Sequence, residues 1–311
     1  EYMTKEAYEA AGQSFVGAAS VTASTELTDF ILGGVDYVAA YINNATITGL
    51  EAGTEYVCRV SDGNGSWSEA VEFATHTDDE TTSFVVMGDA QLHGNDDADA
   101  SAIASLHALA AKNTEVDFGI QTGDFVDGGT NFVQWEQILR QFGSAFKGID
   151  FVHTMGNHEA YTSNGTPATV ITTRLYGLTE EQTKFYSVEY GDVYVAVINQ
   201  AATTNLSEAA QWLVEDAAKS DCTWKVMVTH QPVYYTNPNG SSQGHHQALA
   251  PACDEAGIDF VFSGHDHAYA RTEQIADRSA LKLELDEELG CYVDADGNVA
   301  ATQGQGTVYF I

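Results

Sequence analysis

Two histidines separated by one aspartate, His265 and His267, stand directly after an apolar run in the stretch FSGHDHAYAR. Successive side chains of an extended segment point to opposite faces, so these imidazoles would straddle the backbone, either as surface residues or around something that lies between them. Other apolar runs of the chain also end in residues that can bind metal ions: Asp89, Asp124, Asn157 and His230. Carboxylate, amide and imidazole groups together form a ligand set suited to first-row transition metals.

The elements that must position these side chains alternate between strands and helices from Ser83 onward. The apolar runs that predict strands cover 83–89, 116–124, 149–159, 193–199, 224–230 and 258–267. Helical spacing of apolar residues covers 97–113, 131–142, 207–219 and 247–257. This alternation predicts a largely parallel sheet covered by helices, and ligands of such sheets bind outside the carboxyl ends of the strands. The six side chains should therefore converge, and unpaired charges gathered there would be costly without a cation.

The first quarter of the chain has a different pattern. Turn residues separate short β-rich segments, which predict a small antiparallel sandwich: 37–42, 45–50, 55–60 and 70–75. The stretch ITGLEAGTEYVCRV resembles the fibronectin type III signature, in which the tyrosine, here Tyr56, closes a corner through its hydroxyl. Too few residues precede it for a complete sandwich, so we expect a truncated domain. A polar linker at 74–82 separates this domain from the rest of the chain, and we expect domains at 1–78 and 79–311.

Five short motifs carry a second resemblance. GDAQ, GDFVDGG, GNHE, VTH and GHDHAY resemble the five blocks of the calcineurin-like metallophosphoesterases, over residues 83 to 272. The fibronectin-like front end and the HDHAYAR ending are most similar to the purple acid phosphatase branch. The resemblance implies an α/β fold, a four-layer α-β-β-α sandwich, preceded by the small all-β domain.

The same resemblance implies two metal ions, of Fe, Mn or Zn. Asp89, Asp124 and His267 would hold the first ion. Asp124 would bridge to the second, held also by the set Asn157, His230 and His265. Two such ions can clamp the attacking and leaving oxygens of a phosphate ester, and a hydroxide between them would be the nucleophile.

Further residues receive roles from the family pattern. His158 would donate to a phosphoryl oxygen or to the leaving group, and Asp127 would orient it. Asp127 can also be a turn residue before two glycines. His245 and His246 stand where purple acid phosphatases carry a substrate-binding pair, although isolated loop histidines are more often exposed and without a role.

Two positions depart from the family. Purple acid phosphatases place an iron-binding tyrosine at the position of Asp127, and other members place a histidine at that of Gln91. The amide oxygen of Gln91 is expected to complete the first site, with His93 as the alternative. We expect this site to be rich in oxygen ligands and weaker, which favours Mn²⁺, Fe²⁺ or Zn²⁺ over tyrosinate-bound Fe³⁺.

The amino-acid composition limits the kinds of partner that the protein can bind. The 311 residues carry 12 Lys and Arg against 45 Asp and Glu, a net charge of −33 that would repel a nucleic-acid backbone. No apolar run is long enough to span a membrane. Four cysteines form no zinc-type spacing and are expected as buried free thiols: Cys58, Cys222, Cys253 and Cys291. We expect an exported protein whose signal peptide precedes Glu1, with further sequence after Ile311.

These observations favour hydrolysis of small phosphomonoesters. A phosphodiesterase or a nucleotide hydrolase on the same metals is the alternative within the enzymes. A surface adhesion or binding module that retains a metal site without turnover is the alternative from another class. The presence of His158 beside all six ligands favours an enzyme.

Overall fold

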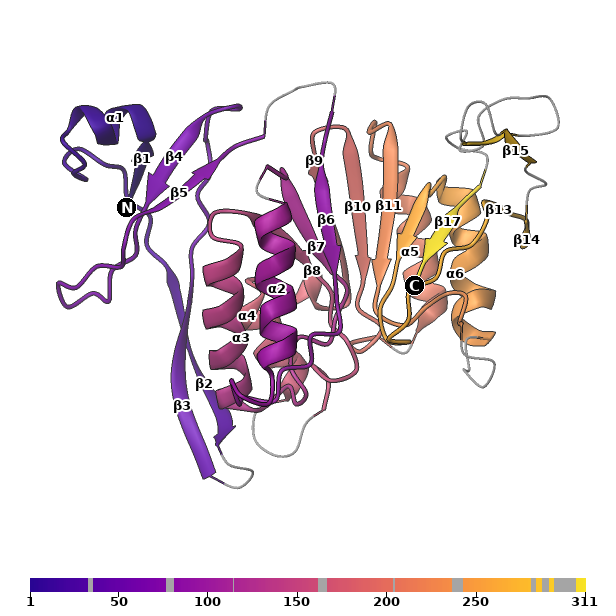
Figure 1. The fold of residues 1–311 in the computed structure, drawn as a ribbon, viewed down its shortest axis with the longest axis horizontal. Helices are drawn as coiled ribbons and strands as arrows, with labels where there is room; N and C mark the ends of the chain where they lie inside the picture. The colour runs from indigo at the N-terminus through magenta and orange to yellow at the C-terminus, as the bar shows by residue number, and fades with distance from the viewer. Residues whose placement is uncertain are drawn as a thin grey trace.

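Two sheets packed face to face form the centre of the molecule, as the computed structural model shows (Figure 1). The structure describes residues 1–32, 36–76, 81–113, 115–161, 167–203, 205–236, 243–280, 284–286, 291–293 and 306–311. The first sheet is parallel and contains β6 (Phe84–Met87), β7 (Phe118–Gln121) and β8 (Asp150–His153).

The second sheet has the order β17-β12-β11-β10-β9. Its strands are β9 (Phe185–Tyr190), β10 (Val193–Ile198), β11 (Trp224–Thr229), β12 (Phe260–Phe262) and β17 (Val308–Phe310). All neighbours are parallel except β9, which pairs with β10 as an antiparallel hairpin. The parallel strands of both sheets therefore deliver the loops at their carboxyl ends to the same side of the molecule (Figure 1).

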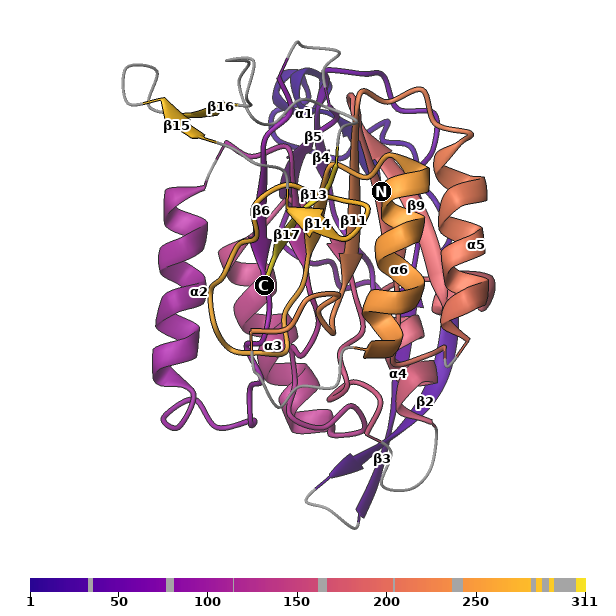
Figure 2. The ribbon, with the colours of Figure 1, turned by 90° about the vertical axis from the view of Figure 1, so that its right-hand side faces the viewer.

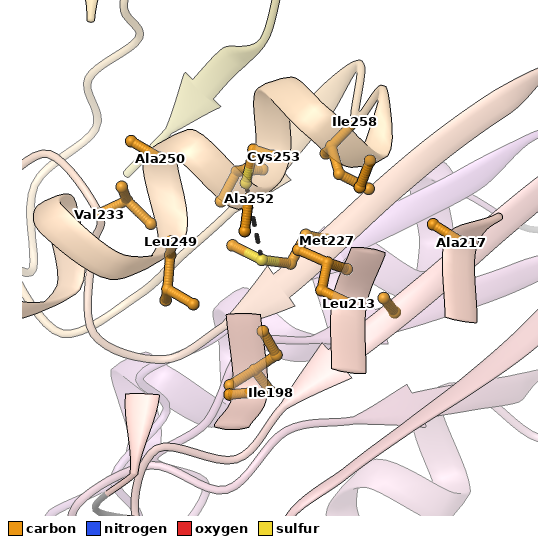
Figure 3. Close-up of a cluster of buried hydrophobic side chains, with 14 of the residues drawn as sticks. Ile198, Leu213, Ala217, Met227, Val233, Leu249, Ala250, Ala252, Cys253 and Ile258 are labelled. Atoms are coloured by element: carbon orange, nitrogen blue, oxygen red, sulfur yellow. Dashed lines mark hydrogen bonds between the residues drawn. The ribbon is translucent and has the colours of Figure 1, made fainter. Parts of the chain in front are cut away.

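Helices cover the outer face of each sheet (Figure 2). The first sheet packs on α2 (Ala100–Lys112) and α3 (Phe132–Ala145), and the second on α5 (Leu206–Ala217) and α6 (Gln243–Ala256). The apolar cluster under α5 and α6 includes Leu213, Met227 and Cys253, all fully buried (Figure 3). Phe118 and Val195 lie in another cluster between the two sheets. These layers confirm the predicted α-β-β-α sandwich.

Some elements were not predicted. Helix α4 (Ala168–Leu175) and strand β9 both come after GNHE in the chain, and a 3-10 turn (Glu181–Thr183) separates them. Short pairs occupy the region before β17: β13 (Ile275–Ala276) with β14 (Ser279–Ala280), and β15 (Glu284–Asp286) with β16 (Cys291–Val293).

The N-terminal region consists of two separate β units. One is a three-stranded antiparallel sheet of β1 (Tyr2–Thr4), β4 (Glu55–Cys58) and β5 (Val71–Ala74), next to the short helix α1 (Lys5–Ala10). The other is a ribbon of β2 (Ser24–Leu32) and β3 (Asp36–Asn44). The predicted corner is formed, because the Tyr56 hydroxyl accepts a hydrogen bond from Glu51 N at 2.9 Å.

One predicted strand of this region is wrong. Residues 45–50 form no strand, and Gly49, with φ +74°, turns the backbone out of an extended path. The expected domain boundary between residues 78 and 79, and most of the expected linker, fall at 77–80, outside the described residues.

The ribbon packs against the α/β part of the chain rather than against the three-stranded sheet. Phe30 is 2% exposed and meets Phe132 of α3 edge to face, with ring centroids 5.5 Å apart. Ile31 N donates to Thr130 O at 2.8 Å, and Asn44 Nδ2 donates to Arg174 O of α4 at 2.8 Å. The ribbon is thus part of the core that surrounds α3.

Two expectations about the whole chain can be compared with the structure. Among the described residues, no helix is both long and apolar enough to cross a membrane. Cys58, Cys222 and Cys253 are free thiols, although only Cys253 is fully buried, and the side chain of Cys291 lies outside the described residues.

Candidate metal centre

The six side chains expected to bind metal all lie just after carboxyl ends of strands. Those from the first sheet carry oxygen ligands: Asp89 after β6, Asp124 after β7 and Asn157 after β8. Those from the second sheet are imidazoles: His230 after β11, with His265 and His267 after β12. The parallel order of the strands brings both groups to one edge of the sandwich, so each half of the chain supplies one kind of ligand.

His230 lies at the centre of the cluster and is buried. Its Nε2 is 3.1 Å from Asp124 Oδ2, 3.0 Å from Asn157 Oδ1 and 3.3 Å from His265 Nδ1. Its other nitrogen, Nδ1, is 2.9 Å from Thr122 O, a carbonyl that can only accept a hydrogen bond. Nδ1 therefore carries a proton, and in the neutral ring Nε2 offers a lone pair toward two further acceptors.

This arrangement fits a metal ion. Lone pairs of a carboxylate, an amide oxygen and imidazoles face one another, which is favourable only with a cation or an added proton among them. A ligand histidine commonly donates its second N–H to a backbone carbonyl, as His230 does toward Thr122. Ligand atoms of Asp124, His230 and His265 all lie within 4.8 Å of one another.

The two histidines of the GHDH stretch lie beside different partners. His265 is next to His230, whereas His267 Nε2 is 3.4 Å from Asp89 Oδ1. The backbone N–H of His265 donates to the same Asp89 oxygen at 2.9 Å. Asp89 and His267 thus form a second part of the cluster, on the side of β6 and β12.

The backbone at this edge is strained. Among the described residues, eight non-glycine residues have positive φ, and five of them belong to this site: Asp89, Gln91, Asp124, His265 and His267. Each such conformation costs on the order of 1–3 kcal/mol and tends to occur at functional sites. Glycines leave room for the carboxylates, because a Cβ at Gly156 would lie 2.0 Å from Asp124 Oδ1 and one at Gly264 would lie 2.2 Å from Asp89 Oδ2.

Burial and charge oppose each other in the cluster. Burial tends to raise the pKa of Asp124, but its hydrogen bond with His230 and the charge of that ring outweigh this, and the pKa is lowered. Burial tends to lower the pKa of His230, and the contacts with Asp124 outweigh this, so the pKa is raised. Burial prevails for Asp89, whose pKa is raised, and for His265, whose pKa is lowered. In the absence of a metal ion, the cluster therefore favours a proton on His230, beside the carboxylate of Asp124.

Gln91 lies beside the cluster, but its amide nitrogen faces it. Gln91 Nε2 donates to Asp124 Oδ2 at 3.4 Å, so a flip of the amide would be needed for its oxygen to point there. The alternative ligand His93 is engaged elsewhere, because its Nδ1 is 2.9 Å from Asp99 Oδ1 and the ring is largely exposed.

His158 is held at the rim of the cluster. Its backbone N–H donates to Asp124 Oδ1 at 2.9 Å, and its ring Nδ1 is 2.8 Å from the carbonyl oxygen of Asp127. The carboxylate of Asp127 is farther away, at 3.4 Å. Asp127 thus orients the ring mainly through its backbone, which leaves Nε2 on the side of Asp124, at 3.9 Å.

His245 and His246, the pair expected to bind substrate, lie in the first turn of α6. Their side chains have different neighbours. Burial, and then the charge of His265, lower the pKa of His245, so this ring lies within electrostatic reach of the cluster. His246 instead packs on Tyr234, with ring centroids 4.6 Å apart. The charge effect of His265 thus reaches His245, whereas the ring contact of His246 is with Tyr234.

Glu159 is a site residue to which the sequence assigned no role. It is fully buried, and its two carboxylate oxygens accept hydrogen bonds of 2.7–3.3 Å from four backbone N–H groups: Asp124, Phe125, Val126 and Gly156. Burial, followed by the charge of Asp124, raises its pKa to about 7. Glu159 ties the loop after β7 to the loop after β8, and its place in GNHE was the only signal in the sequence.

Comparison with known proteins agrees with this fold. Residues 82–269 match the Calcineurin-like phosphoesterase family, and residues 2–75 match the Purple acid Phosphatase, N-terminal domain. The chain therefore belongs to the calcineurin-like phosphoesterases. Its N-terminal region is similar to the N-terminal domain of the purple acid phosphatases.

The relatives and the solved structure to which the chain is similar are named as phosphatases. The chain is 26% identical over 259 residues to purple acid phosphatase 22 of Arabidopsis thaliana, covering 78% of this chain and 56% of the relative. It is 23% identical over 269 residues to phosphoenolpyruvate phosphatase of Allium cepa, covering 78% and 52%. The fold is similar to that of a purple acid phosphatase from yellow lupin (Lupinus luteus) seeds, with TM-score 0.73, 17% identity, and coverage of 100% of this chain and 58% of that one. The chain thus spans little more than half the length of these proteins.

Proposed function

We propose that this protein hydrolyses phosphate esters, most readily small phosphomonoesters, with the help of two metal ions. The observation that carries the proposal is the convergence of Asp124, Asn157 and His265 on His230 Nε2, which gathers the lone pairs that a cation would bind. Two ions bound there would polarise the phosphoryl oxygens and activate a water.

Each side chain has a role in holding the ions. Asp89 and His267, with Asp124, would hold the first ion. Asp124 would also contact the second ion, together with Asn157, His230 and His265. The first site has fewer imidazoles, and Gln91 offers it only a neutral amide, so we expect the first ion to bind more weakly. The available ligands suit Fe, Mn or Zn.

His158 acts on the substrate rather than on the ions. With Nδ1 held by the carbonyl of Asp127, the ring presents Nε2 toward the phosphoryl group. When the ring is protonated at both nitrogens, Nε2–H can donate a hydrogen bond to a phosphoryl oxygen or give its proton to the departing alkoxide, which leaves as an alcohol. His245 would contact the same substrate from α6.

The fibronectin type III-like character of the N-terminal region and the export of the protein stay predictions.

The test combines metal analysis with kinetics. Purified protein should contain close to two ions per chain and should hydrolyse monoesters faster than diesters or nucleotides. His158→Ala should keep the metal content and lower turnover by roughly 10²–10⁴-fold, the range for one acid–base group. His107→Ala, on the outer helix α2, is the matched control and should leave turnover unchanged. A preference for diesters would show that the protein is a phosphodiesterase instead. Metal binding without any turnover would show that it is a binding module that retains a metal site.

A further inference from the structure

A single turn begins at the ligand Asn157 and ends at Tyr161. Ala160 N donates to Asn157 O, and Tyr161 N donates to His158 O, each at 3.2 Å. Residues three and four apart in such a turn lie on the same face. The tyrosine is therefore placed over both Asn157 and His158.

Tyr161 contacts both of these side chains. Asn157 Nδ2 donates to the Tyr161 hydroxyl at 3.0 Å. The phenol ring lies against the imidazole of His158, with ring centroids 4.8 Å apart and planes at 59°. Tyr161 is 53% exposed, so these contacts, rather than burial in the core, define its surroundings.

The contact with Asn157 affects the amide that is expected to bind the second ion. Only the oxygen of an amide can bind a cation, and Asn157 Oδ1 already points toward His230 Nε2. In that orientation the amide nitrogen needs an acceptor on the opposite side, and the Tyr161 hydroxyl supplies it. Partners of this kind around a ligand commonly change metal affinity by about 10–100-fold.

We propose that Tyr161 is a positioning residue that orients Asn157 toward the second ion and restrains the ring of His158. The hydroxyl acts on the ligand, and the ring acts on the acid–base histidine. The kinetic part of this inference rests on the proposed function, whereas the metal-binding part does not.

Two variants separate the two contacts. Tyr161→Phe removes the hydroxyl and keeps the ring, and it should weaken binding of one of the two ions by about 10–100-fold. Affinity is measured without substrate, by titrating Mn²⁺ or Zn²⁺ into metal-free protein against a competing chelator. Tyr161→Ala should show the same loss of affinity. At saturating metal it should also have a lower kcat than Tyr161→Phe, with KM unchanged, because the ring of His158 is no longer restrained.

Tyr37→Phe is the matched control, since Tyr37 is 57% exposed and lies on the ribbon strand β3. Equal affinity for both ions in Tyr161→Phe and the natural protein would overturn the role toward Asn157, and so would failure of the natural protein to bind metal. Equal kcat in the two Tyr161 variants at saturating metal would overturn the role toward His158. If the natural protein binds two ions but hydrolyses no ester, the proposed function fails, and the titration alone decides the inference.

Discussion

At the scale of single residues, the site depends on buried charges that bind backbone rather than metal. Glu159→Gln tests this, because a glutamine has only one oxygen and would turn an amide nitrogen toward N–H donors that now bind a carboxylate. Leaving buried donors unpaired costs about 1–3 kcal/mol, and hydrogen bonds to charged groups lie in the upper part of such ranges. We expect a loss of about 3 kcal/mol in unfolding free energy at pH 8, measured by urea denaturation of metal-free protein.

The control for this variant is Glu136→Gln, at an exposed position of α3. It should change the unfolding free energy by less than about 0.5 kcal/mol. A Glu159→Gln protein as stable as the natural one would mean that the four N–H groups find other partners.

The sequence could predict the residues that point into the site. It could not predict the residues that hold them in place. Asp89, Asp124 and His230 each end an apolar run, so strand geometry alone brings them together. Glu159 and Tyr161 received no role from the sequence, because their contacts depend on how one turn lies against a neighbouring loop. Gln91 illustrates the same limit, since sequence position put it in the site but could not tell which end of its amide faces Asp124.

The imidazole of His153, whose residue is partly buried, should make stability depend on pH. Burial lowers its pKa to about 4 in the folded protein, whereas the unfolded chain takes up this proton near pH 6.5. The unfolded state therefore binds more protons between these values, so the contribution is fully present above pH 6.5 and is lost as the pH falls toward 4. The loss amounts to at most about 3 kcal/mol.

His153→Phe removes this group while keeping a ring beside Tyr176, on which His153 stacks with centroids 4.5 Å apart. Urea denaturation at pH 7 and pH 4.5 should show a smaller drop in unfolding free energy for the variant than for the natural protein. Equal drops would show that His153 is not the group responsible.

At the scale of elements, the ribbon of β2 and β3 joins the N-terminal region to the α/β sandwich. Phe30→Ala should lower the unfolding free energy by about 3–5 kcal/mol, because it empties a buried site against Phe132. The whole molecule should be destabilised, with one thermal transition at lower temperature. Leu27→Ala, on the same strand but 54% exposed, is the control and should have little effect. Two transitions, of which only one moves, would contradict the shared core.

The elements were predictable where their periodicity was strong. The runs ending in Asp124 and His230 are strands, and the segment around Trp135 is a helix, as their patterns predict. Helix α4 could not be found this way, because ATVITTRL is rich in β-branched residues that favour strands. Burial of Ile171 against the core around α3 outweighs that local preference.

At the scale of the whole molecule, a net charge of −33 opposes the compact state. Screening should therefore stabilise it, and we expect the thermal midpoint at pH 7 to rise by several degrees between 20 mM and 0.5 M NaCl. The gain should shrink at pH 4.5, where many carboxylates take up protons. Calorimetry at both pH values measures this, and a midpoint that falls with salt at pH 7 would show that local ion pairs outweigh the net repulsion.

The division of ligands between the sheets also fixes an order of events in time. Oxygen ligands come from the segment 84–157 and imidazoles from the segment 224–267, so neither segment alone carries the complete set. Contacts this distant along the chain form late in folding, after the local strands and helices. Ion capture is therefore a last step of assembly and cannot guide the earlier ones. Under the proposed function, the ions present in the compartment where the two sheets first close are the first that the assembled site can bind.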